Sequence, residues 1–175
     1  KDFIENVLEQ TEVLKNIANE FSQYAALNRI NPEKISVEEN LSSIASLFSN
    51  REHVNIEFDF KAEPFTVFMD PIQFKRVLTN LLQNAIQAVP EGDIKIKLIT
   101  RETGKEKIIE ITDNGIGIPE DQLEKIFQPN FTTKSSGTGL GLAMVKSMLS
   151  SASASVEVKS QINKGSTFTL VFPNA

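Results

Sequence analysis

The sequence DPIQFKRVLTNLLQNAIQAV, residues 70–89, carries the clearest helix signal in the chain. Asp70 is a favourable N-cap, Pro71 suits the first helical position, and Gln73 stands three residues after the cap. The segment predicts a helix that continues to about Ala88 and ends at the Pro-Glu-Gly of 90–92. Its apolar residues recur at helical spacing and predict one core-facing stripe, made of Phe74, Val77, Leu78, Leu81, Leu82, Ala85 and Val89.

Around this helix the apolar residues change to a two-residue period, which is typical of strands. Residues 54–60 alternate strictly and predict a strand with one buried face, and residues 65–69 predict its partner. The other expected strands are 94–100 and 107–112, joined as a hairpin, then 156–159 and 167–172, and the shorter helices are expected at about 37–48 and 140–149. The pattern predicts an α+β fold, a two-layer α/β sandwich whose mixed sheet is covered by helices on one face.

The N-terminal residues up to Leu27 show a different pattern. Their apolar side chains recur close to a heptad seam, at Phe3, Val7, Leu14, Ile17, Phe21 and Tyr24. They predict a long amphipathic helix that stops at Asn31-Pro32, because the residue before a proline disfavours the helical conformation. A dimerisation helix and a helix packed on its own domain fit this periodicity equally well. We expect two units, residues 1–31 and residues 32–175.

Composition and charge exclude several classes of protein. The 175 residues are 40% hydrophobic and 23% charged, as in a soluble globular domain, and the net charge of −5 makes nucleic acid an unexpected partner. No apolar run reaches the roughly 18 residues of a membrane span. The absence of cysteine excludes disulfides and fits a cytoplasmic location. Because the chain begins at Lys1, a longer parent anchored in the inner membrane stays compatible with this expectation.

Two asparagines, Asn80 and Asn84, lie one turn apart on the polar side of the predicted central helix. Their amide oxygens can ligate a hard cation such as Mg²⁺, which prefers oxygen donors and keeps substrate phosphates among its ligands. Asparagines on helices are also commonly just solvated. The pair alone therefore leaves both interpretations open.

Two glycine-rich segments follow in a long loop at 113–139, and loops of that length are usually functional. In 113–119, Asp-Asn-Gly-Ile-Gly-Ile-Pro, the carboxylate can accept a hydrogen bond from an exocyclic amine, and the glycines let the backbone approach a flat base such as adenine. An ordinary turn would use the same residues. In 137–142, Gly-Thr-Gly-Leu-Gly-Leu, backbone N–H groups at a helix start can face a polyphosphate. This segment is neither a Walker loop nor a Rossmann fingerprint.

The order of these motifs is more specific than any one of them. From about residue 70 to residue 173 the chain resembles the catalytic ATP-binding domain of histidine kinases, within the superfamily that includes DNA gyrase, the ninety-kilodalton heat-shock chaperones and MutL. Residues 80–85 resemble its asparagine box, 113–117 and 137–142 its two principal glycine boxes, and 127–134, Phe-Gln-Pro-Asn-Phe-Thr-Thr-Lys, its phenylalanine box.

The resemblance implies roles for individual residues and implies ATP and Mg²⁺ as cofactors. Asn84 would ligate Mg²⁺ with Asn80 beside it, and Asp113 would bind the adenine amine, assisted by Gly117 and Thr167. Residues 118–136 would form a lid over the nucleotide, held by packing of Phe127 and Phe131. Lys134 would either meet the terminal phosphate or be a solvated lid lysine. The implied nucleotide-binding set is Asn80, Asn84, Asp113, Gly115, Gly117, Ile118, Thr133, Lys134, Gly137, Thr138, Gly139, Leu140, Gly141, Leu142 and Thr167, and the implied catalytic set is Asn80, Asn84 and Lys134.

One position favours a kinase over an ATPase. Hydrolysing members of the superfamily carry a water-activating glutamate one turn before the metal-binding asparagine, and this chain has Asn80 there. Without a general base for water, phosphoryl transfer to another nucleophile is favoured. Two other positions depart from the common pattern: Gln87 replaces a frequent basic residue, as in nitrogen-regulation-type sensors, and Asn130 replaces a second phenylalanine.

The phosphoacceptor is the missing part. Histidine kinases phosphorylate a histidine on the first of two dimerisation helices, whereas the only histidine here, His53, lies in a charged stretch before a strand and is expected at the surface. The resemblance therefore implies that residues 1–31 are the remainder of a dimerisation region, with the acceptor helix elsewhere in a dimeric parent, and that a response-regulator receiver domain takes the phosphate. An anti-sigma-type serine kinase and a nucleotide-binding scaffold without catalysis stay as alternatives.

Overall fold

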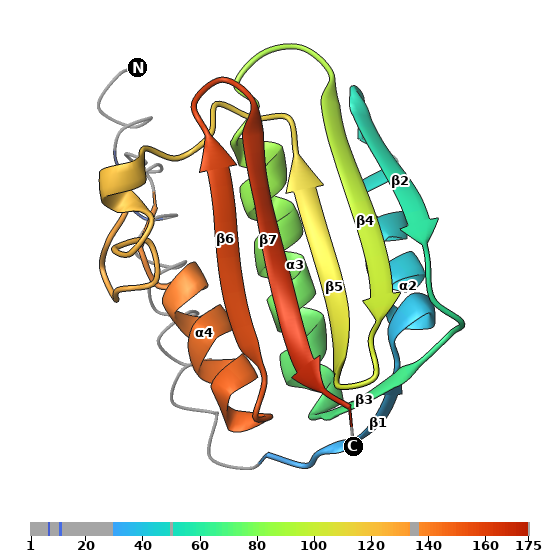
Figure 1. The fold of residues 1–175 in the computed structure, drawn as a ribbon. Helices are drawn as coiled ribbons and strands as arrows, with labels where there is room; N and C mark the ends of the chain where they lie inside the picture. Colours follow the sequence, from blue (N-terminus) through green and yellow to red (C-terminus); the bar gives the residue numbers. More distant parts are fainter. Residues whose placement is uncertain (1–6, 8–10, 12–29, 50, 134–136, 175) are drawn as a thin grey trace.

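Three helices cover one face of a mixed sheet in the computed structural model, which describes residues 7, 11, 30–49, 51–133 and 137–174 (Figure 1). Within that part of the chain the sheet has five strands in the order β2-β4-β5-β7-β6. Their bounds are β2 Val54–Phe60, β4 Ile94–Glu102, β5 Glu106–Asp113, β6 Ser155–Gln161 and β7 Gly165–Pro173. Strand β2 is parallel to β4 and the other pairs are antiparallel, so the predicted α+β class and mixed sheet are confirmed.

The helices are α2 (Val37–Ser49), α3 (Pro71–Gln87) and α4 (Gly141–Ser151), and a short 3₁₀ turn, η2, covers Glu120–Gln122. Helix α3 begins as its sequence predicts, because the Asp70 carboxylate accepts hydrogen bonds from the backbone N–H groups of Ile72 and Gln73. The Gln73 side chain accepts a hydrogen bond from Ser151 Oγ at 3.2 Å. This bond joins the first turn of α3 to the last turn of α4.

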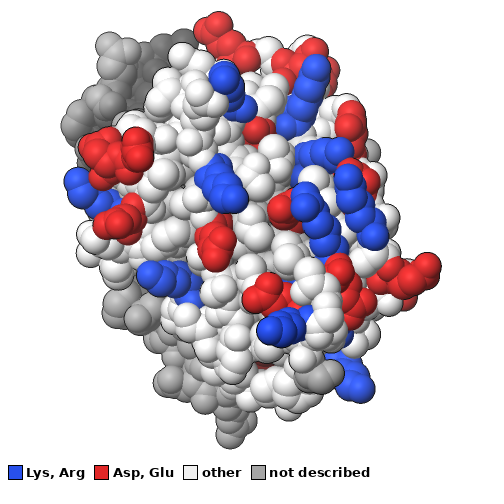
Figure 2. Space-filling view, in the orientation of Figure 1, with Lys and Arg blue, Asp and Glu red and all other residues white. Residues whose placement is uncertain are grey.

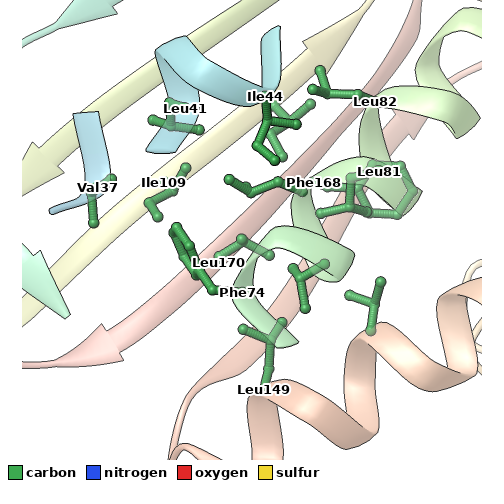
Figure 3. Packing of buried hydrophobic residues seen from close by; sticks show 14 of the residues in the cluster. Val37, Leu41, Ile44, Phe74, Leu81, Leu82, Ile109, Leu149, Phe168 and Leu170 are labelled. Atoms are coloured by element: carbon green, nitrogen blue, oxygen red, sulfur yellow. The ribbon is translucent and has the colours of Figure 1, made fainter. Parts of the chain in front are cut away.

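The core lies between the helices and the sheet (Figure 3). Helix α3 contributes Phe74, Val77, Leu78 and Leu81, none of them exposed, and the Phe74 ring meets the edge of Phe172 of β7 at 6.2 Å between centroids. Full burial of side chains of this size stabilises the fold by about 1.5–3 kcal/mol each. The predicted stripe is confirmed except at Val89, which is only half-buried because it follows the helix.

One prediction for the first half of the chain was wrong and another was confirmed only in part. Residues 66–69 form strand β3 (Thr66–Met69), which pairs antiparallel with β1 (Glu33–Ser36) in a separate two-stranded sheet and does not pair with β2. Strand β1 was not predicted. The expected buried face of β2 is only partly present: Ile56 packs partly against the core, whereas Phe58 and Phe60 are 44% and 39% exposed. Strand β2 is at the edge of the sheet, where it has one strand neighbour, and the two rings instead contact each other at 5.4 Å.

The other face of the sheet is charged and open to solvent (Figure 2). Lys97 Nζ of β4 lies 2.9 Å from the Asp59 carboxylate of β2, and Arg101 pairs with Glu110 of β5 at 2.6 Å. The hydrogen bond from Lys97 holds the pKa of Asp59 below its usual value. Among the described residues there is no helix with the length and apolar character of a membrane span.

The predicted N-terminal helix at 3–27 lies outside the described residues apart from Val7 and Thr11. The Thr11 hydroxyl donates a hydrogen bond to the Val7 carbonyl, a helical spacing. The division between residues 1–31 and 32–175 stays a prediction.

Candidate nucleotide-binding site

Asp113 lies at the end of β5 and is only 4% exposed. Its Oδ1 accepts hydrogen bonds from the backbone N–H groups of Gly115, at 2.8 Å, and Ser166, at 3.3 Å. These two bonds come from the loop after β5 and from β7, and both hold the same carboxylate oxygen. A buried acid held in this way is a preorganised acceptor for an amine.

The glycines near Asp113 allow close approaches between backbone segments. Gly115 packs on the end of α3, where a Cβ would lie 2.6 Å from the Ala88 carbonyl oxygen. Gly117, with φ +74°, packs on the Gln161 carbonyl of β6, and Gly165, with φ +98°, packs on the Asp113 carbonyl, both too closely for any Cβ. Residues 113–117 therefore pack tightly between the end of α3, β6 and β7.

Two serines that sequence reasoning missed complete this environment. Ser160 Oγ accepts a hydrogen bond from Ile118 N–H at 2.7 Å and donates to the Gly165 carbonyl at 3.0 Å. Since the Ser160 proton is used there, the 2.9 Å contact between Ser160 Oγ and Ser166 Oγ assigns the donor role to Ser166. The lone pairs of Ser166 Oγ then remain beside Asp113.

The Thr167 side chain lies on the opposite face of the sheet from the Asp113 side chain. Its hydroxyl is 2.9 Å from Thr112 Oγ1, and Thr112 is its direct partner across β5 and β7. Because side chains alternate along a strand, Thr112 and Thr167 share the face opposite to Asp113. Ser166, buried to 5% exposure, is the neighbour that faces the Asp113 side.

Helix α3 connects the other predicted motifs. Asn80 is next to the glycine-rich turn, since a Cβ on Gly141 would lie 3.7 Å from Asn80 Oδ1. Ala88 contacts the other glycine segment, where Ile116 N–H donates to the Ala88 carbonyl at 2.9 Å. Asn84 lies one turn from each of these contacts, and both asparagines are half-buried. The structure therefore places Asn84 between the two glycine segments, about 6 Å along the helix from each.

The glycine-rich turn leads directly into α4, which begins at Gly141 with Leu140 as its N-cap residue. Thr138 Oγ1 accepts a weak hydrogen bond from Leu140 N–H at 3.4 Å, and Gly137 to Leu142 are all half-buried. The first backbone N–H groups of a helix lack partners within the helix, so they can face an anion here.

The predicted lid packs on the domain through its aromatic residues. Phe127 meets the edge of Phe168 of β7 at 6.5 Å between ring centroids, and Phe131 also packs partly against the core. Asn130 takes φ +66°, which asparagine tolerates, and its N–H donates to the Gly139 carbonyl at 3.1 Å. Thr133 is exposed, and Lys134 lies outside the described residues.

His53 is at the surface, as predicted. Its Nδ1 lies 3.3 Å from Asp93 Oδ1, and 70% of its side chain is exposed. In the described ranges no three His, Asp or Glu side chains gather as a metal site. Amide oxygens such as those of Asn80 and Asn84 are ligands that a hard cation accepts.

The cavity that adjoins Asp113 measures about 330 Å³ and is lined also by Ser160, Lys164, Ser166 and Thr167. It opens at the ends of β6 and β7. Asn80, Asn84 and the glycine-rich turn do not line it, so the proposed phosphate-binding groups lie on a different side of Asp113.

Residues 69–175 match the family model described as histidine kinase-, DNA gyrase B-, and HSP90-like ATPase. The chain therefore belongs to this family, and its relatives place it with the catalytic domains of sensor histidine kinases. Over 130 residues it is 40% identical to sensor histidine kinase ZraS of Escherichia coli K12, a match that covers 74% of this chain and 28% of ZraS. Over 175 residues it is 34% identical to the histidine-protein kinase ArlS of Staphylococcus aureus USA300, covering 97% of this chain and 37% of ArlS.

Solved structures share the fold. The catalytic domain of histidine kinase ThkA is 28% identical with a TM-score of 0.73, covering 82% of this chain and 95% of that domain. A crystal structure of ThkA in complex with response regulator protein TrrA has a TM-score of 0.81 at 24% identity and covers 100% of this chain and 51% of that one. The chain spans about a third of the length of the curated relatives named above.

Proposed function

We propose that this chain binds Mg-ATP and transfers the γ-phosphate to a histidine outside residues 1–175, for relay to a response-regulator receiver domain. The observation that carries the proposal is the position of Asp113, buried at a strand end and fixed by Gly115 and Ser166 N–H groups. Next to it, α3 presents Asn84 between the two glycine segments. The family supplies ATP as the nucleotide.

Different residues of this chain are proposed to contact different parts of the nucleotide. Asp113 accepts from the adenine amine, while Gly115 and Gly117 leave room for the ring. The backbone N–H groups at 139–142 face the phosphates, where a helix start favours negative charge. Asn84 would hold Mg²⁺, which neutralises phosphate charge when bound. Asn80, beside Gly141, and Lys134 are proposed as further phosphate contacts.

Transfer is favoured over hydrolysis by the side chain at residue 80. Asn80 carries an amide, which cannot take a proton from water, and it lies against the glycine-rich turn. Phosphoryl transfer depends mainly on positioning and on electrostatic stabilisation, so a pocket built of amides and N–H groups is sufficient.

The partner proposals rest on relatives. ThkA forms a complex with a response regulator, which supports a receiver domain as the next phosphate acceptor for this chain. We assign residues 32–175 to the catalytic unit and residues 1–31 to the remainder of a dimerisation region, in a parent that is homodimeric and acts on the cytoplasmic side. The acceptor helix belongs to that parent.

The chemical stability of the product tests the proposal. When the chain is incubated with γ-labelled ATP, Mg²⁺ and an acceptor domain that carries a helical histidine, we expect labelled acceptor whose phosphate is lost in acid and retained in alkali, because a phosphoramidate bond hydrolyses in acid. An acceptor with glutamine in place of that histidine is the control. Label that survives acid would indicate a serine kinase, and a chain that binds no nucleotide would indicate a scaffold.

Substituting two neighbouring residues separates the two faces of β7. Ser166→Ala should weaken ATP binding about 5- to 20-fold, since it removes one hydrogen-bonding group beside Asp113, worth about 1–2 kcal/mol. Thr167→Ala is the matched control and should change affinity less than about twofold, because its hydroxyl pairs with Thr112 on the other face. Isothermal titration calorimetry measures both. A larger loss of affinity in Thr167→Ala than in Ser166→Ala would contradict this assignment and indicate that Thr167 contacts the nucleotide.

A further inference from the structure

The Asp70 carboxylate joins two segments that are 39 positions apart in the chain. Its Oδ1 accepts from the N–H groups of Ile72 and Gln73, at 2.9 and 3.0 Å, and so caps α3. Its Oδ2 accepts from the N–H of Asn31 at 2.9 Å. Asp70 is only 7% exposed. The Asp70 side chain thus caps the start of α3 and also holds the backbone at Asn31, just before the first strand of the domain.

The charge of Asp70 strengthens both functions. Burial raises the pKa of this carboxyl group, but hydrogen bonds from the backbone of Asn31, Gln73 and Ile72, together with the charge of Arg76, outweigh burial and leave the pKa below its usual value. The group is therefore ionised at neutral pH. Hydrogen bonds to a carboxylate are shorter and stronger than those between neutral groups.

The surroundings of Asp70 connect the chain at 30–32 to both nucleotide-binding helices. A cavity of about 240 Å³ lies there, lined by Ile30 and Pro32 on one side and by residues of β3, α3 and α4 on the other. Gln73 of α3 and Ser151 of α4 both line it and are hydrogen-bonded to each other. Ile30 and Pro32, the two neighbours of Asn31 in the chain, therefore face the same cavity as the first turn of α3 and the last turn of α4.

Asp70 is far from the proposed nucleotide site. Helix α3 runs along the sheet away from this end (Figure 1). Asn84 is 14 residues after Asp70, which corresponds to about 21 Å of helix. Asp70 therefore cannot touch the nucleotide, and any effect on the reaction must pass through the placement of the catalytic domain.

We propose that Asp70 is a positioning residue: its Oδ2 bond to Asn31 fixes the direction in which the chain N-terminal to Asn31 leaves the catalytic domain. This bond thereby sets the distance that the γ-phosphate must cross to reach its histidine. The role in phosphoryl transfer rests on the proposed function, whereas the restraint at Asn31 does not.

Three substitutions of Asp70 separate the bond to Asn31 from the helix cap. Asp70→Asn keeps a carbonyl oxygen for the cap but turns an NH₂ donor toward the Asn31 N–H. Asp70→Ser also caps a helix, yet it is too short to reach Asn31 at the same time. Asp70→Ala loses both. Asp59→Asn is the matched control, an Asp with a lowered pKa on the open face of the sheet.

Distances between spin labels measure the restraint. The sequence has no cysteine, so nitroxide labels at Val7→Cys and Glu157→Cys, both exposed positions, report without background. We expect the width of the distance distribution to increase at least twofold in all three Asp70 variants and to stay unchanged in Asp59→Asn. The melting temperature should fall by roughly 2–4 °C more in Asp70→Ala than in the other two, because only Asp70→Ala loses the cap. An unchanged width in Asp70→Asn would overturn the proposal.

Kinetics test the consequence for transfer. In the kinase polypeptide that carries the acceptor histidine, Asp70→Asn should lower the transfer rate at saturating ATP at least fivefold while the affinity for ATP stays within twofold. An unchanged rate would overturn the role of Asp70 in transfer. If the chain without any substitution bound no ATP, the proposed function would fail, but the spin-label result would still hold. The two failures are therefore distinguishable.

Discussion

Asp113→Asn is expected to abolish ATP binding without unfolding the domain. The asparagine Oδ1 can still accept from the N–H groups of Gly115 and Ser166, so the β5–β7 contact survives. Its NH₂ group, however, meets the adenine amine donor to donor. Loss of a charged hydrogen bond costs about 1.5–3 kcal/mol, and the unsatisfied buried donors add a similar amount. Calorimetry should therefore show affinity at least about 100-fold weaker.

Asp59→Asn serves as the control for that experiment, because Asp59 lies on the open face of the sheet and pairs with Lys97. Asp59→Asn should bind ATP with the same affinity as the unsubstituted chain. A melting temperature of Asp113→Asn close to that of the unsubstituted chain would show that the loss of ATP binding is a local effect and not a result of unfolding. Binding of adenine nucleotide by Asp113→Asn at parental affinity would contradict the assignment of the whole pocket.

Gly165→Ala is expected to cause the largest loss of stability among single-methyl additions. Gly165 starts β7 with φ +98°, and an added Cβ would overlap the Asp113 carbonyl and lie 3.0 Å from Asn114 Cα. A positive φ costs a non-glycine residue about 1–3 kcal/mol, and overpacking against backbone adds about 1–3 kcal/mol. We expect urea unfolding to show a loss of roughly 3–5 kcal/mol, with nucleotide binding weakened because Asp113 is displaced.

Gly104→Ala is the matched control. Gly104 lies in the β4–β5 turn, has no positive φ, and would have no neighbouring atom within 4 Å of an added Cβ. Its substitution should change the free energy of unfolding by less than about 0.5 kcal/mol, as for other surface changes. A loss of under about 1 kcal/mol in Gly165→Ala would mean that β7 can move away from Asp113 without penalty.

The features that sequence predicted well are those set by local chemistry. Helix α3 depends on the Asp70 cap and on a stripe such as Phe74 and Leu78, all within a single segment, and its start was correct. The β4–β5 hairpin has a short connection, so its pairing was also correct. In both cases neighbouring residues alone decide the structure.

The errors concern long-range pairing and burial. Strand β3 pairs with β1, about thirty residues earlier, and nothing in either short segment specifies that register. The strict alternation of β2 predicted a buried face, but alternation does not say whether a strand lies at an edge. Phe58 and Phe60 are therefore exposed despite a pattern typical of a half-buried strand.

Within the site, one missed residue could have been found and another could not. Phe168, Leu170 and Phe172 mark the inward face of β7, so Thr167 had to point away and Ser166 inward. That signal was present in the sequence. Ser160 contacts Ile118 only because of the register between β6 and β7 and the path of the loop, and no local pattern contains that information.

The place of β7 in the sheet has a consequence for biosynthesis. This strand is the last in chain order, yet it lies inside the sheet between β5 and β6 and supplies the N–H of Ser166 to Asp113. Non-local strand pairing must wait until both partners are available. A growing polypeptide on the ribosome therefore cannot complete the surroundings of Asp113 until residues 165–173 have left the exit tunnel. If the proposed function holds, we expect an interrupted translation product that ends earlier not to bind ATP.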